Sequence, residues 1–299
     1  MNSFDEMLKK QQSSGLTQIV EAAKKSAAYE GGGKDLRFWK ATPDKAGNAQ
    51  ALIRFLPAPD QDIPWAKYYE HSFKTQSGKW FWENCPTTIG LDCPVCESNS
   101  KNWNAGRDDL KDVARSRKRK LHYVANIIVL KEAANPENEG KVFLLKFGVK
   151  IFDKLMGAME PTFDDEEAFN PFNLLNGAPF KFRQKMVEEY PNYDSSEFGS
   201  CEPLFGGDVD KMRSVFEQSH PIGEFTAASN FKSHEELKKK FNSLTGEGES
   251  AMDSIKSFSA PVERSAPLPS FEDEVSAAES SIVDDDEDIA YFQRLANAE

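Results

Sequence analysis

Residues 71–96 read HSFKTQSGKWFWENCPTTIGLDCPVC and contain three of the chain's four cysteines. Cys93 and Cys96 form a CxxC knuckle, seven residues separate Cys85 from Cys93, and His71 begins the stretch. Zinc prefers four nitrogen or sulfur ligands in a tetrahedron, and a two-residue gap lets both thiolates of a knuckle reach one ion. The stretch therefore predicts one zinc ion that ties the loop over 64–99 into the core, held by His71, Cys85, Cys93 and Cys96.

Two other interpretations of this stretch stay open. One is a redox CxxC of thioredoxin type, which does not explain Cys85, and the other is four buried residues without metal. For the fourth ligand, His122 or Cys201 competes with His71. Because three Cys and one His fill the coordination sphere, whereas a catalytic zinc keeps a position open for water, we expect a structural ion.

Outward from the cysteines, the core is predicted to be mainly β with some α. Short apolar runs bounded by turn residues are typical of strands, and helical spacing of apolar residues indicates helices. The predicted strands are 51–56, 79–82, 123–130, 142–147 and 180–187, with a hairpin loop over 134–140, and the predicted helices are 151–159 and 234–244.

The two ends of the chain differ from this core. Residues 1–25 have helical spacing, and Gly31, Gly32 and Gly33 mark a boundary. Beyond Gly246 the composition turns to Ser, Ala, Pro and Glu, which buries too little apolar surface to offset chain entropy. We expect an arm over 1–30, a core over 31–245 with a zinc subdomain at about 64–105, and a disordered tail over 246–299.

Charge is divided unevenly along the chain. The tail holds 14 acidic and three basic residues, so it carries −11 of the net charge of −12. Residues 101–150 hold 12 basic and six acidic residues. Cations bind phosphates and aromatic faces stack on bases, a combination that predicts single-stranded nucleic acid with little base preference. The candidate contacts are Arg115, Arg117, Lys118, Arg119, Lys120, Lys146, Trp103, Tyr123, Tyr190 and Tyr193.

The sequence resembles a known family, the helix-destabilising single-stranded DNA-binding proteins of T-even bacteriophages. The resemblance runs through QALIRFLP at 50–57, His71, GKW at 78–80, the CPVC knuckle, KRK at 118–120, Tyr123, ANI at 125–127, 136–143 and NYD at 192–194. It covers the region of about 39–194 well, whereas the two ends are similar only in their general character.

This resemblance implies an OB-fold core and cooperative coating of single strands in DNA replication, recombination and repair. It implies zinc on the ligands named above, DNA contacts at the basic run and at Tyr123 and Tyr193, and self-association through the N-terminal arm. Val124 and Leu145 stand where the family has aromatic residues, so we expect a reduced or relocated stacking platform. The arm, at best Lys9 to Ser13 with Asp5 and Glu6 before it, departs from the family's basic arm.

We accordingly expect a non-enzymatic protein of the infected bacterial cytoplasm, without signal peptide or membrane span. Its tail would compete with DNA for the basic surface and dock replication and recombination proteins through Asp284, Asp285, Asp286, Glu287 and Asp288. A zinc-dependent nuclease would need an open metal site and clustered carboxylates. A zinc-ribbon module that binds RNA or protein is the second alternative.

Overall fold

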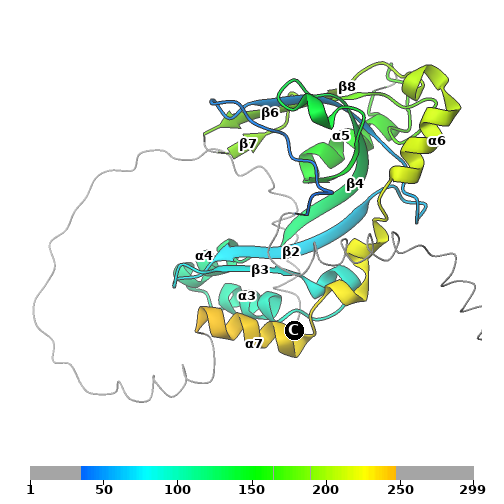
Figure 1. Cartoon of the computed structure of the whole chain (residues 1–299). Helices are drawn as coiled ribbons and strands as arrows, with labels where there is room; N and C mark the ends of the chain where they lie inside the picture. The colour runs from blue at the N-terminus through cyan, green and yellow to red at the C-terminus, as the bar shows by residue number, and fades with distance from the viewer. Residues whose placement is uncertain (1–34, 164, 189, 247–299) are drawn as a thin grey trace, which may run out of the picture. The chain divides into compact units, whose positions relative to one another are not determined.

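The computed structural model describes residues 35–246 except 164 and 189, and the chain divides into two compact units (Figure 1). Unit 1 comprises the residues up to Pro64 together with Val124–Pro221. Unit 2 comprises Trp65–Tyr123 together with the residues from Ile222 onward. The predicted N-terminal helix and the predicted disordered tail lie outside the described residues.

Unit 1 is built around antiparallel strands. Its central pair is β1 (Ala49–Phe55) and β4 (Lys120–Lys131), a strand whose first residues belong to unit 2. The other strands are β5 (Val142–Phe147) on β4, β6 (Phe180–Val187) on β1, and β7 (Tyr190–Asn192) and β8 (Glu197–Phe198) on β6. Its helices are α5 (Val149–Met159) and α6 (Val209–Gln218).

Aromatic rings fill much of the unit 1 core. Phe55 is fully buried and lies 5.5 Å from Phe172 and 5.6 Å from Phe180, measured between ring centroids. At the end of β4, the buried Glu132 carboxylate accepts hydrogen bonds from the Trp39 indole at 2.9 Å and the Asn138 amide at 2.8 Å. These bonds satisfy a carboxylate that would otherwise be costly to bury.

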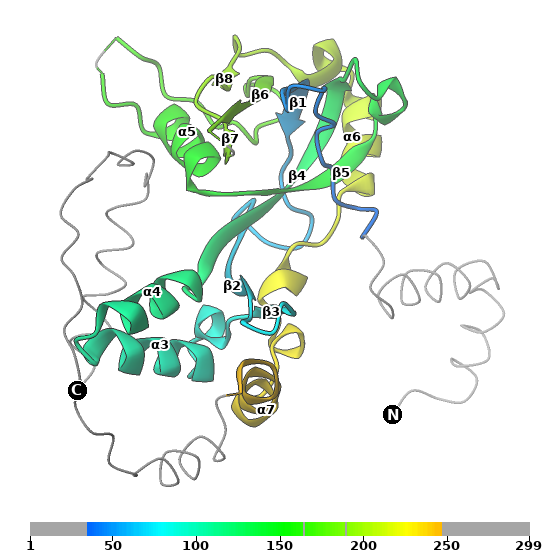
Figure 2. The same ribbon diagram turned by 90° about the vertical axis from the view of Figure 1, so that its left-hand side faces the viewer.

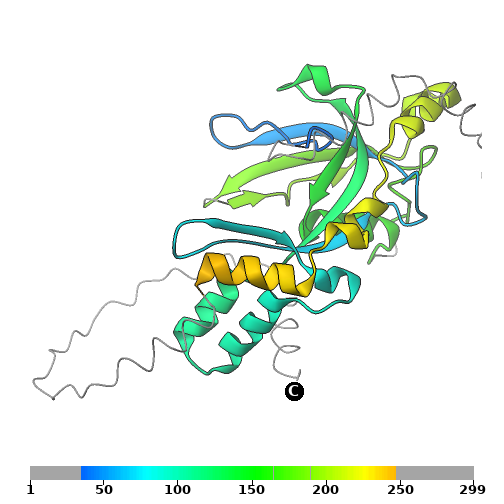
Figure 3. The ribbon, with the colours of Figure 1, turned by 60° about the horizontal axis from the view of Figure 1, so that its bottom comes forward.

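The described part of unit 2 contains a β-hairpin and three α-helices, besides short 3-10 turns. β2 (Ala66–Lys74) pairs with β3 (Trp80–Asn84), and the helices are α3 (Pro94–Asn104), α4 (Asp108–Ser116) and α7 (His234–Thr245). Figures 2 and 3 show these helices beside the hairpin. Phe81 on β3 stacks on Phe73 at 4.9 Å and meets Phe241 of α7 edge-on at 5.8 Å.

Most of the predicted elements are confirmed, and the class is mixed α and β. All five predicted strands and both predicted helices are present, as is the 134–140 connection between β4 and β5. The strands β2, β7 and β8 and the helices α3, α4 and α6 were not predicted. The described residues are therefore richer in helix than the mainly β core that was predicted.

Candidate metal centre and nucleic-acid interface

Four predicted ligands come together in unit 2 from different elements. His71 is on β2, Cys85 follows β3, and Cys93 and Cys96 are at the start of α3. Pro94 occupies the first helical position, where its fixed φ favours helix initiation. Cys93 caps the helix in extended conformation and Cys96 lies in its first turn, so one turn directs both sulfurs to the same place.

The spacing of the four ligand atoms fits a tetrahedral metal site. All lie within 4.8 Å of one another. His71 Nε2 is 3.5 Å from the sulfurs of Cys93 and Cys96, and the sulfurs of Cys85 and Cys96 are 3.6 Å apart. Tetrahedral zinc, with bonds of about 2.3 Å to sulfur and about 2.0 Å to nitrogen, requires about 3.8 Å between sulfurs and about 3.5 Å from sulfur to nitrogen. The cluster could therefore hold a metal ion.

A backbone hydrogen bond fixes the His71 ring. His71 Nδ1 donates to the Arg117 carbonyl oxygen at 2.9 Å, and the Asn99 amide donates to the same oxygen at 3.0 Å. In the neutral imidazole that a metal requires, a proton on Nδ1 leaves Nε2 as the lone-pair nitrogen that faces the sulfurs. The basic segment, residues 115–120, is therefore hydrogen-bonded to the metal cluster through the Arg117 carbonyl oxygen.

The electrostatics of the cluster favour a cation. Burial lowers the pKa of the His71 imidazole, but the sulfurs of Cys85 and Cys93 outweigh this effect and raise that pKa to about 9. Hydrogen bonds from Cys93 and Cys96 lower the pKa of Cys85 far below its ordinary range, whereas the bond to Cys85 raises the pKa of Cys96. The crowded thiols therefore do not all lose their protons in the absence of a cation. A divalent cation would stabilise the thiolates together.

The competing ligands lie elsewhere among the described residues. His71 is the residue whose ligand atom lies close to the three cysteine sulfurs, and neither His122 nor Cys201 belongs to this cluster. His122 lies 3.2 Å from the buried Glu70 carboxylate, and Cys201 is exposed. The geometry thus favours the ligand set with His71.

The predicted basic run splits between the surface and the core of unit 2. Arg117 is only 8% exposed, and its guanidinium lies over the rings of Phe73 and Phe241 at 5.6 and 5.4 Å. Arg119 lies 4.2 Å from the Tyr69 ring and donates to the Thr87 hydroxyl at 2.6 Å. The exposed or half-buried members of the run are Arg115, Lys118, Arg119 and Lys120.

The predicted aromatic contacts are not equally accessible. Trp103 on α3 is half-buried, with the guanidinium of Arg115 5.4 Å from its ring, and Tyr123 is only 3% exposed. In unit 1, Tyr190 on β7 is 71% exposed, and Tyr193 is half-buried against Phe182. Burial raises the pKa of the Tyr193 hydroxyl. Lys146 on β5, also in unit 1, is half-buried.

Two accessible tryptophans were not among the predicted contacts. Trp80 and Trp82 on β3 are 67% and 65% exposed, while Phe81 between them is fully buried. The alternation Trp-Phe-Trp within a predicted strand was the available signal, since alternate residues face opposite sides. Asp284 to Asp288, the predicted partner contacts, lie outside the described residues.

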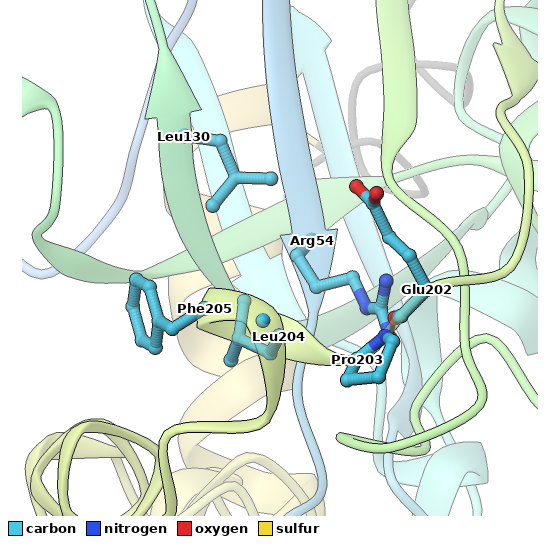
Figure 4. A pocket seen from close by; sticks show the side chains of 7 residues that line it. Arg54, Leu130, Glu202, Pro203, Leu204 and Phe205 are labelled. Atoms are coloured by element: carbon cyan, nitrogen blue, oxygen red, sulfur yellow. Dashed lines mark hydrogen bonds between the residues drawn. The ribbon is translucent and has the colours of Figure 1, made fainter.

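A separate pocket of about 320 Å³ lies in unit 1 beside the buried Arg54 (Figure 4). The Arg54 guanidinium donates to the backbone carbonyls of Asn173 and Glu202 at 2.9 and 3.1 Å. Burial lowers the pKa of Arg54. These hydrogen bonds join β1 to two loops, so Arg54 stabilises the fold.

None of the helices in the described part of the chain is both long and apolar enough to cross a bilayer.

Comparison with known proteins identifies the family. A family model described as "gp32 DNA binding protein like" matches residues 47–245. The protein named single-stranded DNA-binding protein of Enterobacteria phage T2 is 40% identical over 233 residues, covering 74% of this chain and 75% of the relative. Its namesake from Enterobacteria phage T4 is 40% identical over 217 residues, 70% of each chain. A relative from Escherichia phage SV14 is 47% identical over 83 residues, 26% of this chain and 73% of the relative. These relatives are named for binding and not for a reaction. The chain belongs to the gp32-like DNA-binding protein family.

Proposed function

We propose that this protein binds single-stranded DNA without catalysing a reaction, and that a structural zinc ion organises part of its binding surface. The observation that carries the proposal is the shared carbonyl oxygen of Arg117, which ties the basic segment to the metal cluster. Fixing cations in advance reduces the entropy lost when phosphates bind. The names of the T2 and T4 relatives support the same ligand.

Zinc is the cation that fits the donor set best. Three thiolates and an imidazole are soft or borderline ligands, which suit zinc and do not suit magnesium or calcium. When bound, zinc would neutralise the thiolates and cross-link β2, the turn after β3 and α3. Since the protein supplies all four ligands, no position is left for a reacting water, and the zinc-dependent nuclease is disfavoured.

The DNA contacts that we propose form two groups. In unit 2, Arg115, Lys118, Arg119 and Lys120 would neutralise phosphates, with Trp103 beside them. The packing of Arg117 and Tyr123 favours positioning roles for these two residues. In unit 1, which we propose to be an OB-fold, the corresponding contacts would be Lys146, Tyr190 and Tyr193.

We further propose roles for the ends of the chain. Residues 1–30 would mediate self-association along DNA, and residues 246–299 would dock replication and recombination proteins in the cytoplasm of the infected host. The −11 charge of the tail also suits it to compete with DNA for the basic surface when DNA is absent.

Binding to poly(dT) at two salt concentrations, with metal analysis of the same sample, tests the proposal. We expect tight, salt-sensitive binding that quenches tryptophan fluorescence, together with one zinc per chain. A competing RNA oligonucleotide of matched sequence distinguishes the RNA-binding zinc-ribbon alternative. Zinc without binding to single-stranded DNA would refute the proposed function and leave the metal site standing.

A further inference from the structure

The face of the β2–β3 hairpin that bears Trp80 and Trp82 is both aromatic and accessible. Both indoles are exposed and therefore project from β3 away from the core of unit 2, in which Phe81 is buried. Large exposed apolar side chains at adjacent positions on one face are uncommon on a protein surface and indicate a binding site.

A lysine lies beside one of these two indoles. In the pairing of β2 with β3, Lys74 lies directly opposite Trp80, and Ser72 lies opposite Trp82. Directly opposed residues place their side chains on the same face of a sheet. Lys74 is exposed, so an ammonium group stands next to the Trp80 ring position.

The first residues of β4 extend the positive charge on this face. Glu70 opposes Asn84 and therefore shares the face of Trp82, where its buried carboxylate lies 3.2 Å from His122. Lys120 precedes His122 by two residues, so it lies on the same face, and it is exposed. The carboxylate on this face is thus buried and paired, while the lysines face solvent.

On the opposite face, Glu83 forms ion pairs with Lys232 and Lys240. The negative charge of β3 is therefore compensated on the side of α7. What remains for a ligand on the tryptophan side is aromatic surface with lysines beside it.

We infer that Trp80, Trp82, Lys74 and Lys120 form a base-stacking platform for single-stranded nucleic acid. This inference rests on the proposed function and adds a subsite to it. Residues two apart on a strand are about 6.8 Å from each other, twice the separation of about 3.4 Å between stacked bases. A base that stacks on either indole must leave its neighbour in its own strand, which a single strand permits and a base-paired duplex resists.

The full-length variants Trp80→Ala, Trp82→Ala and their combination test the platform by anisotropy of a labelled dT oligonucleotide. Stacking of one base on one aromatic ring corresponds to about a 5- to 150-fold change in affinity, so each single variant should bind at least about fivefold more weakly. Phe163→Ala removes a ring that is 66% exposed in unit 1 and is the matched control. Zinc content and thermal unfolding confirm that each variant is folded.

Two further variants separate stacking from general loss of surface. Trp80→Phe combined with Trp82→Phe keeps aromatic faces, so it should restore most of the affinity while losing much of the fluorescence quenching. Lys74→Ala should reduce the salt dependence of binding by about one phosphate contact.

If the double alanine variant binds DNA as the wild-type protein does, the platform is refuted and the proposed function stands. If its DNA affinity is unchanged but its self-association by light scattering is lost, the face is a protein interface, and the inference is again wrong. If the wild-type protein itself fails to bind single strands, the proposed function fails first, and the platform fails with it.

Discussion

Removing the metal should unfold unit 2 and leave unit 1 folded. Cys85 and Cys93 are fully buried in the hydrophobic cluster that contains Phe73, Phe81 and Phe241. Structural zinc sites contribute about 10–16 kcal/mol of apparent binding free energy, whereas a whole domain is stable by only about 5–15 kcal/mol. Because the metal term is as large as the net stability of a domain, the cluster of unit 2 should not persist without it.

Hydrogen exchange of the chelated and the metal-loaded protein measures this effect peptide by peptide. The β2–β3 hairpin should lose protection on chelation and regain it with zinc, while β6 in unit 1 should not change. Magnesium should fail to restore protection, since it prefers oxygen ligands. Thiol labelling gives a second readout: exposed Cys201 should react in both states, and the three buried or half-buried cysteines only after chelation. Full hairpin protection in protein shown to be metal-free would refute the reasoning.

Three other perturbations follow from the packing and charge of the chain. Phe81→Ala removes a fully buried ring and should lower the free energy of unfolding by about 3–5 kcal/mol in urea titrations, whereas Phe163→Ala should change it by less than about 0.5 kcal/mol; equal effects would contradict the assigned core. Glu132→Ala leaves the buried Trp39 indole and the half-buried Asn138 amide without their acceptor and should cost about 1–3 kcal/mol; Glu137→Ala, at an exposed position, serves as its control in the same assay. Removing the residues beyond Gly246 should tighten oligonucleotide binding at about 50 mM salt and weaken its salt dependence, and identical binding curves would exclude competition by the tail.

The strands that were predicted from the sequence are those in which apolar residues face the core. β5 matches its predicted range to the residue because its apolar run ends at Gly148, and β6 matches because Phe180 and Phe182 alternate with polar residues directly after Pro179. β2 has no such run. Its central residues Glu70 and His71 are buried, and their burial is explained only by partners distant in sequence, His122 and the metal cluster.

The missed helices have a similar explanation. α3 is a polar segment, and its start depends on Pro94 and on two cysteines that the metal cluster draws together. For the site itself, ligand spacing pointed to the three cysteines, while the choice of His71 over His122 and Cys201 needed the structure. The exposure of individual side chains could not be predicted in this way. Arg117 and Tyr123 lie in a basic stretch that suggested a surface, but residues from elsewhere in the chain bury them.

The division of unit 2 into two segments of the chain sets an order of events during synthesis. The metal ligands are complete once Cys96 has been made, but Phe241, which packs on Phe73 and Phe81, follows 145 residues later. At about 5–20 residues per second, that interval lasts on the order of 7–30 s. The nascent chain can therefore bind the proposed zinc ion well before α7 exists to close the core. Zinc supply during translation, and not only afterwards, would then govern how much of the protein matures correctly.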